Sequence, residues 1–124
     1  MKIVFTAKGT DLDSAMDPRF GRTEFFVIYD KETESFESFD NRSIENEAHG
    51  AGPKTAQKLS EYGAEVLVTG NGPGGNAATV LKAAGTKVFV GAADMTVKDA
   101  LEAYNKGELK STQGPSVNSK FGMG

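Results

Sequence analysis

"EVLVTGNGPGGNAATVLKAAGTKVFVG", residues 65–91, is the stretch that decides the fold of this chain. It opens and closes with compact apolar runs, at 65–70 and 87–91, which are typical of buried strands. Between them, small and apolar residues recur at positions i, i+3, i+4 and i+7, namely Ala77, Val80, Leu81 and Ala84. This spacing marks one face of a helix, so the stretch predicts a strand, a helix and a second, parallel strand.

One further helix is predicted on each side of this unit. Downstream, "TVKDALEAYNKG" (96–107) has helical spacing, and the pair Thr96 and Asp99 resembles a capping box at its start. Upstream, apolar residues repeat at helical spacing between Pro53 and Gly63. Proline near the first turn and glycine just past the last turn are typical of helix ends.

Three strand-like runs precede these helices, at 2–7, 24–30 and 35–40. The last two are close enough in sequence to form a hairpin, and the polar "SFESFD" predicts a strand at the sheet edge. We therefore predict an α/β fold with flanking helices and a mixed five-stranded sheet, with strand order 3-2-1-4-5 along the sheet. Residues 1–107 would form a single domain, and the polar, aperiodic segment 108–124 a flexible C-terminal tail.

The composition disfavours several classes of function. The chain has no cysteine, so disulfides, thiolate zinc sites and cysteine-ligated iron–sulfur clusters are excluded. A formal net charge of −3, without aromatic residues interleaved among basic ones, argues against nucleic-acid binding. No apolar stretch approaches the roughly 20 residues that span a bilayer, and the N-terminus lacks a signal pattern. We therefore expect a cytoplasmic protein with no membrane partner.

The unusual sequences lie in loops that this topology brings to one sheet edge. They are "DPRFGR" (17–22), "HGAGP" (49–53) and "GNGPGG" (70–75). The strand order reverses beneath them, and open α/β sheets bind ligands at such switch points. Two helix N-termini, close-approach glycines and two arginines favour an anion there. We predict a pocket lined by Arg19, Phe20, Gly21, Arg22, His49, Gly50, Gly52, Asn71, Gly72, Gly74, Gly75 and Asn76.

Several of these signals also have a structural interpretation. Arg19 and Arg22 are near aspartates, such as Asp17, with which they could form surface ion pairs. Phe20 is compatible with a core residue beneath the loop. His49, the only histidine, is compatible either with a metal ligand or with a polar residue that bonds to backbone near a helix end.

The glycine loop leaves a second function open. "GNGPGG" matches G-x-G-x-x-G at Gly70, Gly72 and Gly75, and Asp94 follows about 20 residues later, as in dinucleotide folds. Against this interpretation, the chain has one plain βαβ unit, and Pro73 within the motif is unusual. A phosphate- or nucleotide-binding module remains one alternative, and a regulatory or partner-binding domain is another.

Two long segments carry a family resemblance. "MDPRFGRTEFFVIYD" (16–30) and "AHGAGPKTAQKLSEYGAEVLVTGNGPGGNAATVLKAAGTKVFVG" (48–91) resemble the dinitrogenase iron–molybdenum cofactor biosynthesis family. The resemblance implies a ribonuclease-H-like fold. It also implies a non-enzymatic carrier or accessory protein for an anionic molybdenum-containing sulfide cluster of the iron–molybdenum or molybdenum–copper type. Cofactor-assembly or regulatory proteins would then be its partners.

The chain departs from the family pattern at one position. Arg19 stands where members that hold the nitrogenase cofactor often have histidine, so the resemblance implies that a metal ligand is lost there. His49 is the remaining candidate metal ligand. The expected mode of binding is therefore through the sulfides and the overall charge of the cluster.

Overall fold

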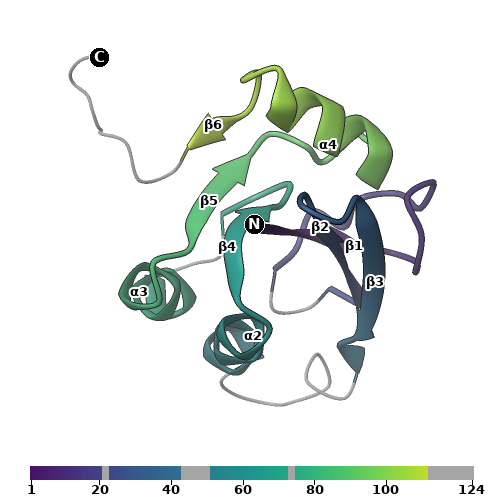
Figure 1. The fold of residues 1–124 in the computed structure, drawn as a ribbon. Coiled ribbons are helices and arrows are strands. Elements are labelled where there is room, and N and C mark those ends of the chain that lie inside the picture. Colours follow the sequence, from purple (N-terminus) through teal and green to yellow (C-terminus); the bar gives the residue numbers. More distant parts are fainter. Residues whose placement is uncertain (21–22, 43–50, 73–74, 112–124) are drawn as a thin grey trace.

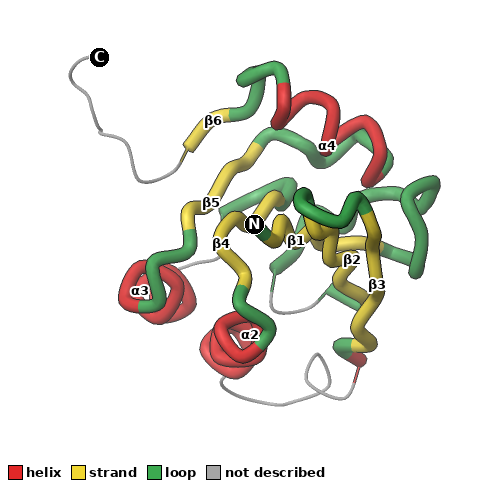
Figure 2. The backbone as a smooth tube through the Cα atoms, viewed as in Figure 1, coloured by secondary structure: helices red, strands yellow, loops and turns green. Residues whose placement is uncertain are grey.

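The computed structural model describes residues 1–20, 23–42, 51–72 and 75–111. Its elements, in chain order, are β1 (Lys2–Ala7), β2 (Phe25–Asp30), β3 (Ser35–Asp40), α2 (Ala51–Glu61), β4 (Ala64–Val68), α3 (Gly75–Ala83), β5 (Lys87–Val90), α4 (Val97–Asn105) and β6 (Lys110–Ser111). The strands form one sheet, with α2 and α3 packed on one face and α4 on the other (Figure 1). Figure 2 shows the same arrangement, with helices in red on both sides of the yellow strands.

The sheet confirms the predicted strand order and adds one strand to it. The observed order is β3-β2-β1-β4-β5-β6, with β1 antiparallel to β2 and parallel to β4. The prediction of five strands is wrong because β6 pairs antiparallel with β5, Phe89 opposite Ser111. This strand has two exposed residues and no apolar alternation, so its sequence gives no strand signal.

Strand β6 lies within the segment predicted as a tail, and residues 112–124 lie outside the described residues.

The ribonuclease-H-like assignment of the fold stays a prediction.

Alternation along the central strand divides the core into two clusters. Ile3 and Phe5 face α4, whereas Val4 between them faces α2 and α3. All three are fully buried, as expected for a strand covered on both faces. Burying a side chain of this size contributes about 1.5–3 kcal/mol, so the two clusters hold both helix layers on the sheet.

The helix ends agree with the predicted signals. The Thr96 hydroxyl caps α4 by accepting a hydrogen bond from the Asp99 N–H at 3.1 Å. Gly85 and Gly107 follow α3 and α4 in the left-handed region, with φ of +80° and +73°. These glycines allow the chain to turn back towards the sheet directly after each helix.

Strand directions determine where the loops meet. Strands β1, β3, β4 and β5 all run the same way, because β2 is antiparallel to both of its neighbours. Their carboxyl ends therefore share one edge of the sheet. Helices α2, α3 and α4 begin after β3, β4 and β5 respectively, so the predicted site lies at this edge.

Candidate anion-binding site

The loop between β1 and β2 is fastened to the carboxyl ends of β1 and β4. The N–H of Asp17 donates to the Thr6 carbonyl at 2.9 Å, and the Thr6 hydroxyl donates to the Asp17 carbonyl at 2.6 Å. One residue further on, the Asn71 N–H donates to the Pro18 carbonyl at 2.9 Å. The first and third predicted loops therefore lie side by side.

Gly70 makes this contact possible. A Cβ at this position would lie 2.6 Å from Pro18 Cα and 2.9 Å from Ala93 Cβ. Two other chain segments thus pack directly against its backbone. The first glycine of "GNGPGG" therefore serves packing within the protein, which weakens the interpretation of the motif as a dinucleotide fingerprint. At Gly72, by contrast, a Cβ would meet nothing within 4 Å.

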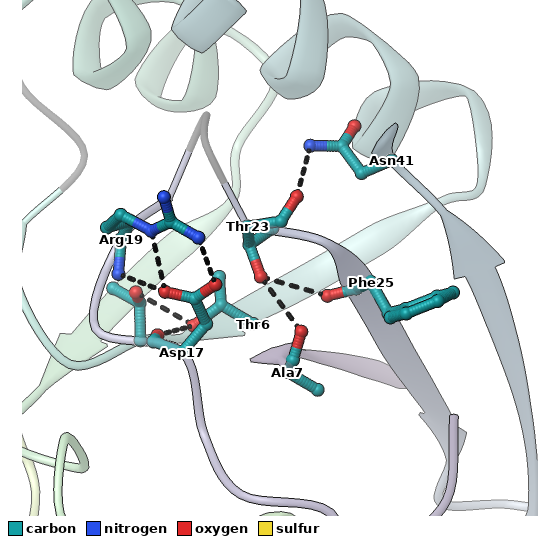
Figure 3. Close-up of polar contacts among 8 residues, drawn as sticks. Thr6, Ala7, Asp17, Arg19, Thr23, Phe25 and Asn41 are labelled. Carbon is teal, nitrogen blue, oxygen red and sulfur yellow. Dashed lines mark hydrogen bonds and ion pairs between the residues drawn. The ribbon is translucent and has the colours of Figure 1, made fainter. Parts of the chain in front are cut away.

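Arg19 is held by a buried carboxylate. Oδ1 of Asp17 accepts hydrogen bonds from the Arg19 backbone N–H at 2.9 Å and from Nε at 3.1 Å. Oδ2 accepts from Nη2 at 3.0 Å (Figure 3). The Asp17 side chain is 0% exposed and that of Arg19 is 51% exposed, so the pair has a buried and a solvent-facing member. The predicted ion pair is confirmed for Asp17, and the guanidinium still reaches the surface.

The electrostatics of Asp17 follow from this geometry. Burial raises the pKa of its carboxyl because the charged form loses water. The hydrogen bonds from the Arg19 side chain and backbone, and the guanidinium charge, act in the opposite direction, and together with Thr23 they hold the pKa below its usual value. Asp17 is therefore a carboxylate at neutral pH.

A buried polar network behind the loop was not predicted. The hydroxyl oxygens of Thr6 and Thr69 lie 3.0 Å apart and share a hydrogen bond, which joins β1 to the end of β4. The Asn41 amide donates to the Thr23 carbonyl at 3.0 Å and accepts from the Thr55 hydroxyl at 3.4 Å. These contacts tie the start of β2 to the end of β3 and to α2. All five residues are fully buried, so these contacts fix the chain beneath the β1–β2 loop.

Phe20, predicted as a lining residue, lies in the core. Its ring is 4% exposed and packs edge-on against Phe26, with centroids 5.9 Å apart. An apolar ring next to Arg19 gains more from burial beneath the loop than from exposure beside it. The packing interpretation of Phe20 is therefore confirmed.

The other predicted residues lie partly within the described regions. Asn71 and Gly72 are exposed after β4, and Gly52, Gly75 and Asn76 lie in the first turns of α2 and α3. Neither first turn carries an acidic residue, whereas α4 has Asp99 in its first turn. Gly21, Arg22, His49, Gly50 and Gly74 fall outside the described residues, and their roles stay predictions.

Within the described ranges, no group of three or more His, Cys, Asp or Glu side chains is placed to hold a metal ion. No helix in those ranges has the length and apolar character needed to cross a membrane.

Comparisons with known proteins agree with this fold. The model of a family described as dinitrogenase iron-molybdenum cofactor matches residues 1–107. The apo form of the orange protein from Desulfovibrio gigas is 40% identical; the match covers 91% of this chain and 93% of that chain, with a TM-score of 0.86. A putative NifB protein from Thermotoga is 36% identical; the match covers 96% of this chain and 97% of that chain, with a TM-score of 0.79. No curated protein matches the sequence.

The family match includes the β1–β2 loop, the glycine loop and all three helices described above. It confirms the family resemblance that was identified from the sequence. The chain belongs to the dinitrogenase iron-molybdenum cofactor family.

Proposed function

We propose that the protein binds an anionic molybdenum-containing sulfide cluster as cargo, at the edge where β1 and β4 end, and that it catalyses no reaction. The observation that carries this proposal is the position of Arg19. Its half-exposed side chain is held by the buried Asp17 carboxylate, one residue after Pro18, whose carbonyl accepts from the Asn71 N–H in the loop that follows β4. A fixed arginine is well suited to multi-point contact with an anion.

The helix starts add to the attraction. The first turns of α2 and α3 contain no acidic residue, so no side chain within them offsets the positive ends of their dipoles. Each such terminus favours negative charge by about 0.3–1 kcal/mol. The starts of α2 and α3 therefore favour an anion.

The donor set determines how the cluster would be held. The chain has no cysteine, and within its described residues no acidic or histidine cluster is placed to coordinate a metal. Hydrogen bonds and charge directed at the sulfides fit these residues better than direct ligation. His49 stays the one predicted metal ligand. The family description, which names the iron-molybdenum cofactor of dinitrogenase, supports a cluster as the cargo.

Location and partners belong to the same proposal. A cluster carrier passes its cargo to another protein, so we propose cofactor-assembly or regulatory proteins as partners. We also propose that the protein is located in the cytoplasm.

Titration of the protein with tetrathiomolybdate and Cu(I), followed by visible spectroscopy and metal analysis, tests the proposal. We expect a saturable, stoichiometric absorption band. Arg19→Gln should weaken uptake. Arg42→Gln is the matched control, because Arg42 makes the same contacts to Asp40 at the end of the outer strand β3. Absence of saturable uptake by the wild-type protein would refute the proposed function.

A further inference from the structure

The chain contains the same Asp-x-Arg clamp twice. In Asp17-Pro18-Arg19 and in Asp40-Asn41-Arg42, the aspartate accepts from the backbone N–H of the arginine at 2.9 Å. In both clamps it also accepts from Nε at 3.1 Å, and from Nη2 at 3.0 Å in the first and 2.8 Å in the second. Both clamps lie at the same edge of the sheet, where β1 and β3 end.

The two clamps differ in the burial of the carboxylate. Asp40 is 50% exposed, and Arg42 lies over the ring of Phe25 on the outer hairpin. Asp17 is 0% exposed and its backbone is bonded to β1. A charged side chain is almost never fully buried unless it is paired. Asp17 therefore depends on Arg19 as its ion-pair partner, whereas water screens the charge of Asp40.

We propose that Asp17 is an internal counter-ion that competes with the bound anion for Arg19 and keeps the cluster weakly held. The inference rests on the proposed function, because it assumes that Arg19 contacts the cargo. Nε and one donor of Nη2 already bond to Asp17, and the nearby carboxylate charge offsets part of the attraction of the guanidinium for an anion. The anion therefore contacts an arginine whose attraction for it is weakened by the Asp17 carboxylate. Weak retention suits a protein that must pass its cargo on.

The proposal makes a prediction in an unusual direction. Asp17→Asn removes a negative charge close to the anion and releases a donor of Arg19. At an effective permittivity of about 20, as near a protein surface, one unit charge about 12 Å from the anion changes its affinity by about tenfold. We therefore expect Asp17→Asn to bind tetrathiomolybdate with Cu(I) about tenfold more tightly than the wild type at low salt. Damage to the fold produces the opposite change, so tighter binding cannot come from destabilisation.

Three comparisons make the test specific. Asp40→Asn makes the same charge change in the same local clamp, and we expect it to bind like the wild type. The advantage of Asp17→Asn should shrink at about 1 M salt, where the Debye length falls to about 3 Å. It should disappear in the Asp17→Asn, Arg19→Gln double variant, because no guanidinium is left for which to compete. If Asp17→Asn does not fold, Asp17→Ser removes the charge and keeps an oxygen acceptor for the Arg19 N–H.

Each outcome has a separate meaning. Equal or weaker binding by a folded Asp17→Asn or Asp17→Ser variant overturns the inference and leaves the proposed function in place. An equal gain in Asp40→Asn also overturns it, because the effect would then come from net charge. Absence of uptake by the wild type refutes the proposed function itself.

Discussion

Replacing Gly70 by alanine should destabilise the protein, and the structure gives the magnitude. The new Cβ would lie 2.6 Å from Pro18 Cα and 2.9 Å from Ala93 Cβ. One of these neighbours is backbone, so no side-chain rotation removes the clash, and the β1–β2 loop must shift. Overpacking of this kind costs about 1–3 kcal/mol. For a domain of about this size we expect the melting temperature to fall by about 4–12 °C.

Gly72→Ala is the matched control in the same loop. A Cβ there meets nothing within 4 Å, so the variant should melt within about 2 °C of the wild type or slightly above it. Thermal unfolding followed by circular dichroism measures both variants. Gly70→Ala should also weaken the uptake of tetrathiomolybdate with Cu(I), because the displaced loop carries Arg19. Equal melting temperatures for the two variants would refute the argument that Gly70 is required by packing.

Three further predictions concern acid stability, a helix cap and the alternative ligand. Because the pKa of Asp17 is lowered in the folded protein, its ion pair stabilises the fold above the ordinary value of 3.8 and ceases to do so as the pH falls through the lowered value. Asp17→Asn should therefore flatten the fall in melting temperature between about pH 5 and pH 2; an unchanged slope would contradict this. Thr96→Ala should lower the free energy of unfolding by about 1 kcal/mol in urea titrations, while Thr96→Ser, which keeps the cap to Asp99, should lose less. Millimolar ATP or NAD should leave the melting temperature unchanged; a rise equivalent to a few kcal/mol would favour the nucleotide-binding alternative.

The main elements could be predicted from sequence because their signals are local. The apolar spacing through Leu81 and the paired Thr96 and Asp99 each depend on residues within one helix, and the structure places helices there. Strand β6 depends instead on an open edge of β5. Nothing in Lys110 and Ser111 themselves distinguishes a two-residue strand from a polar loop.

The contact between the loops after β1 and β4 was predictable because chain topology alone brings them together. The supporting contacts of the site were not predictable. Thr6 and Thr69 are separated by 63 positions and meet only when β1 and β4 pair. Asn41, which follows β3, and Thr55 in α2 likewise come together although they are 14 positions apart. Single buried polar residues have no periodicity, so their roles are determined by tertiary structure.

In the segment "DPRF" (17–20), three residues stabilise the fold and one is available for binding. Asp17 is buried and Phe20 fills the core, while the Pro18 backbone packs on Gly70. These three residues stabilise the loop, and each does so by contacts directed into the protein. Among the four, Arg19 alone presents a half-exposed charged group at the surface. Substitutions at the three structural positions should therefore affect binding through the placement of Arg19. Substitution of Arg19 removes the charged group itself, and it also lowers stability because the buried Asp17 carboxylate loses its ion-pair partner.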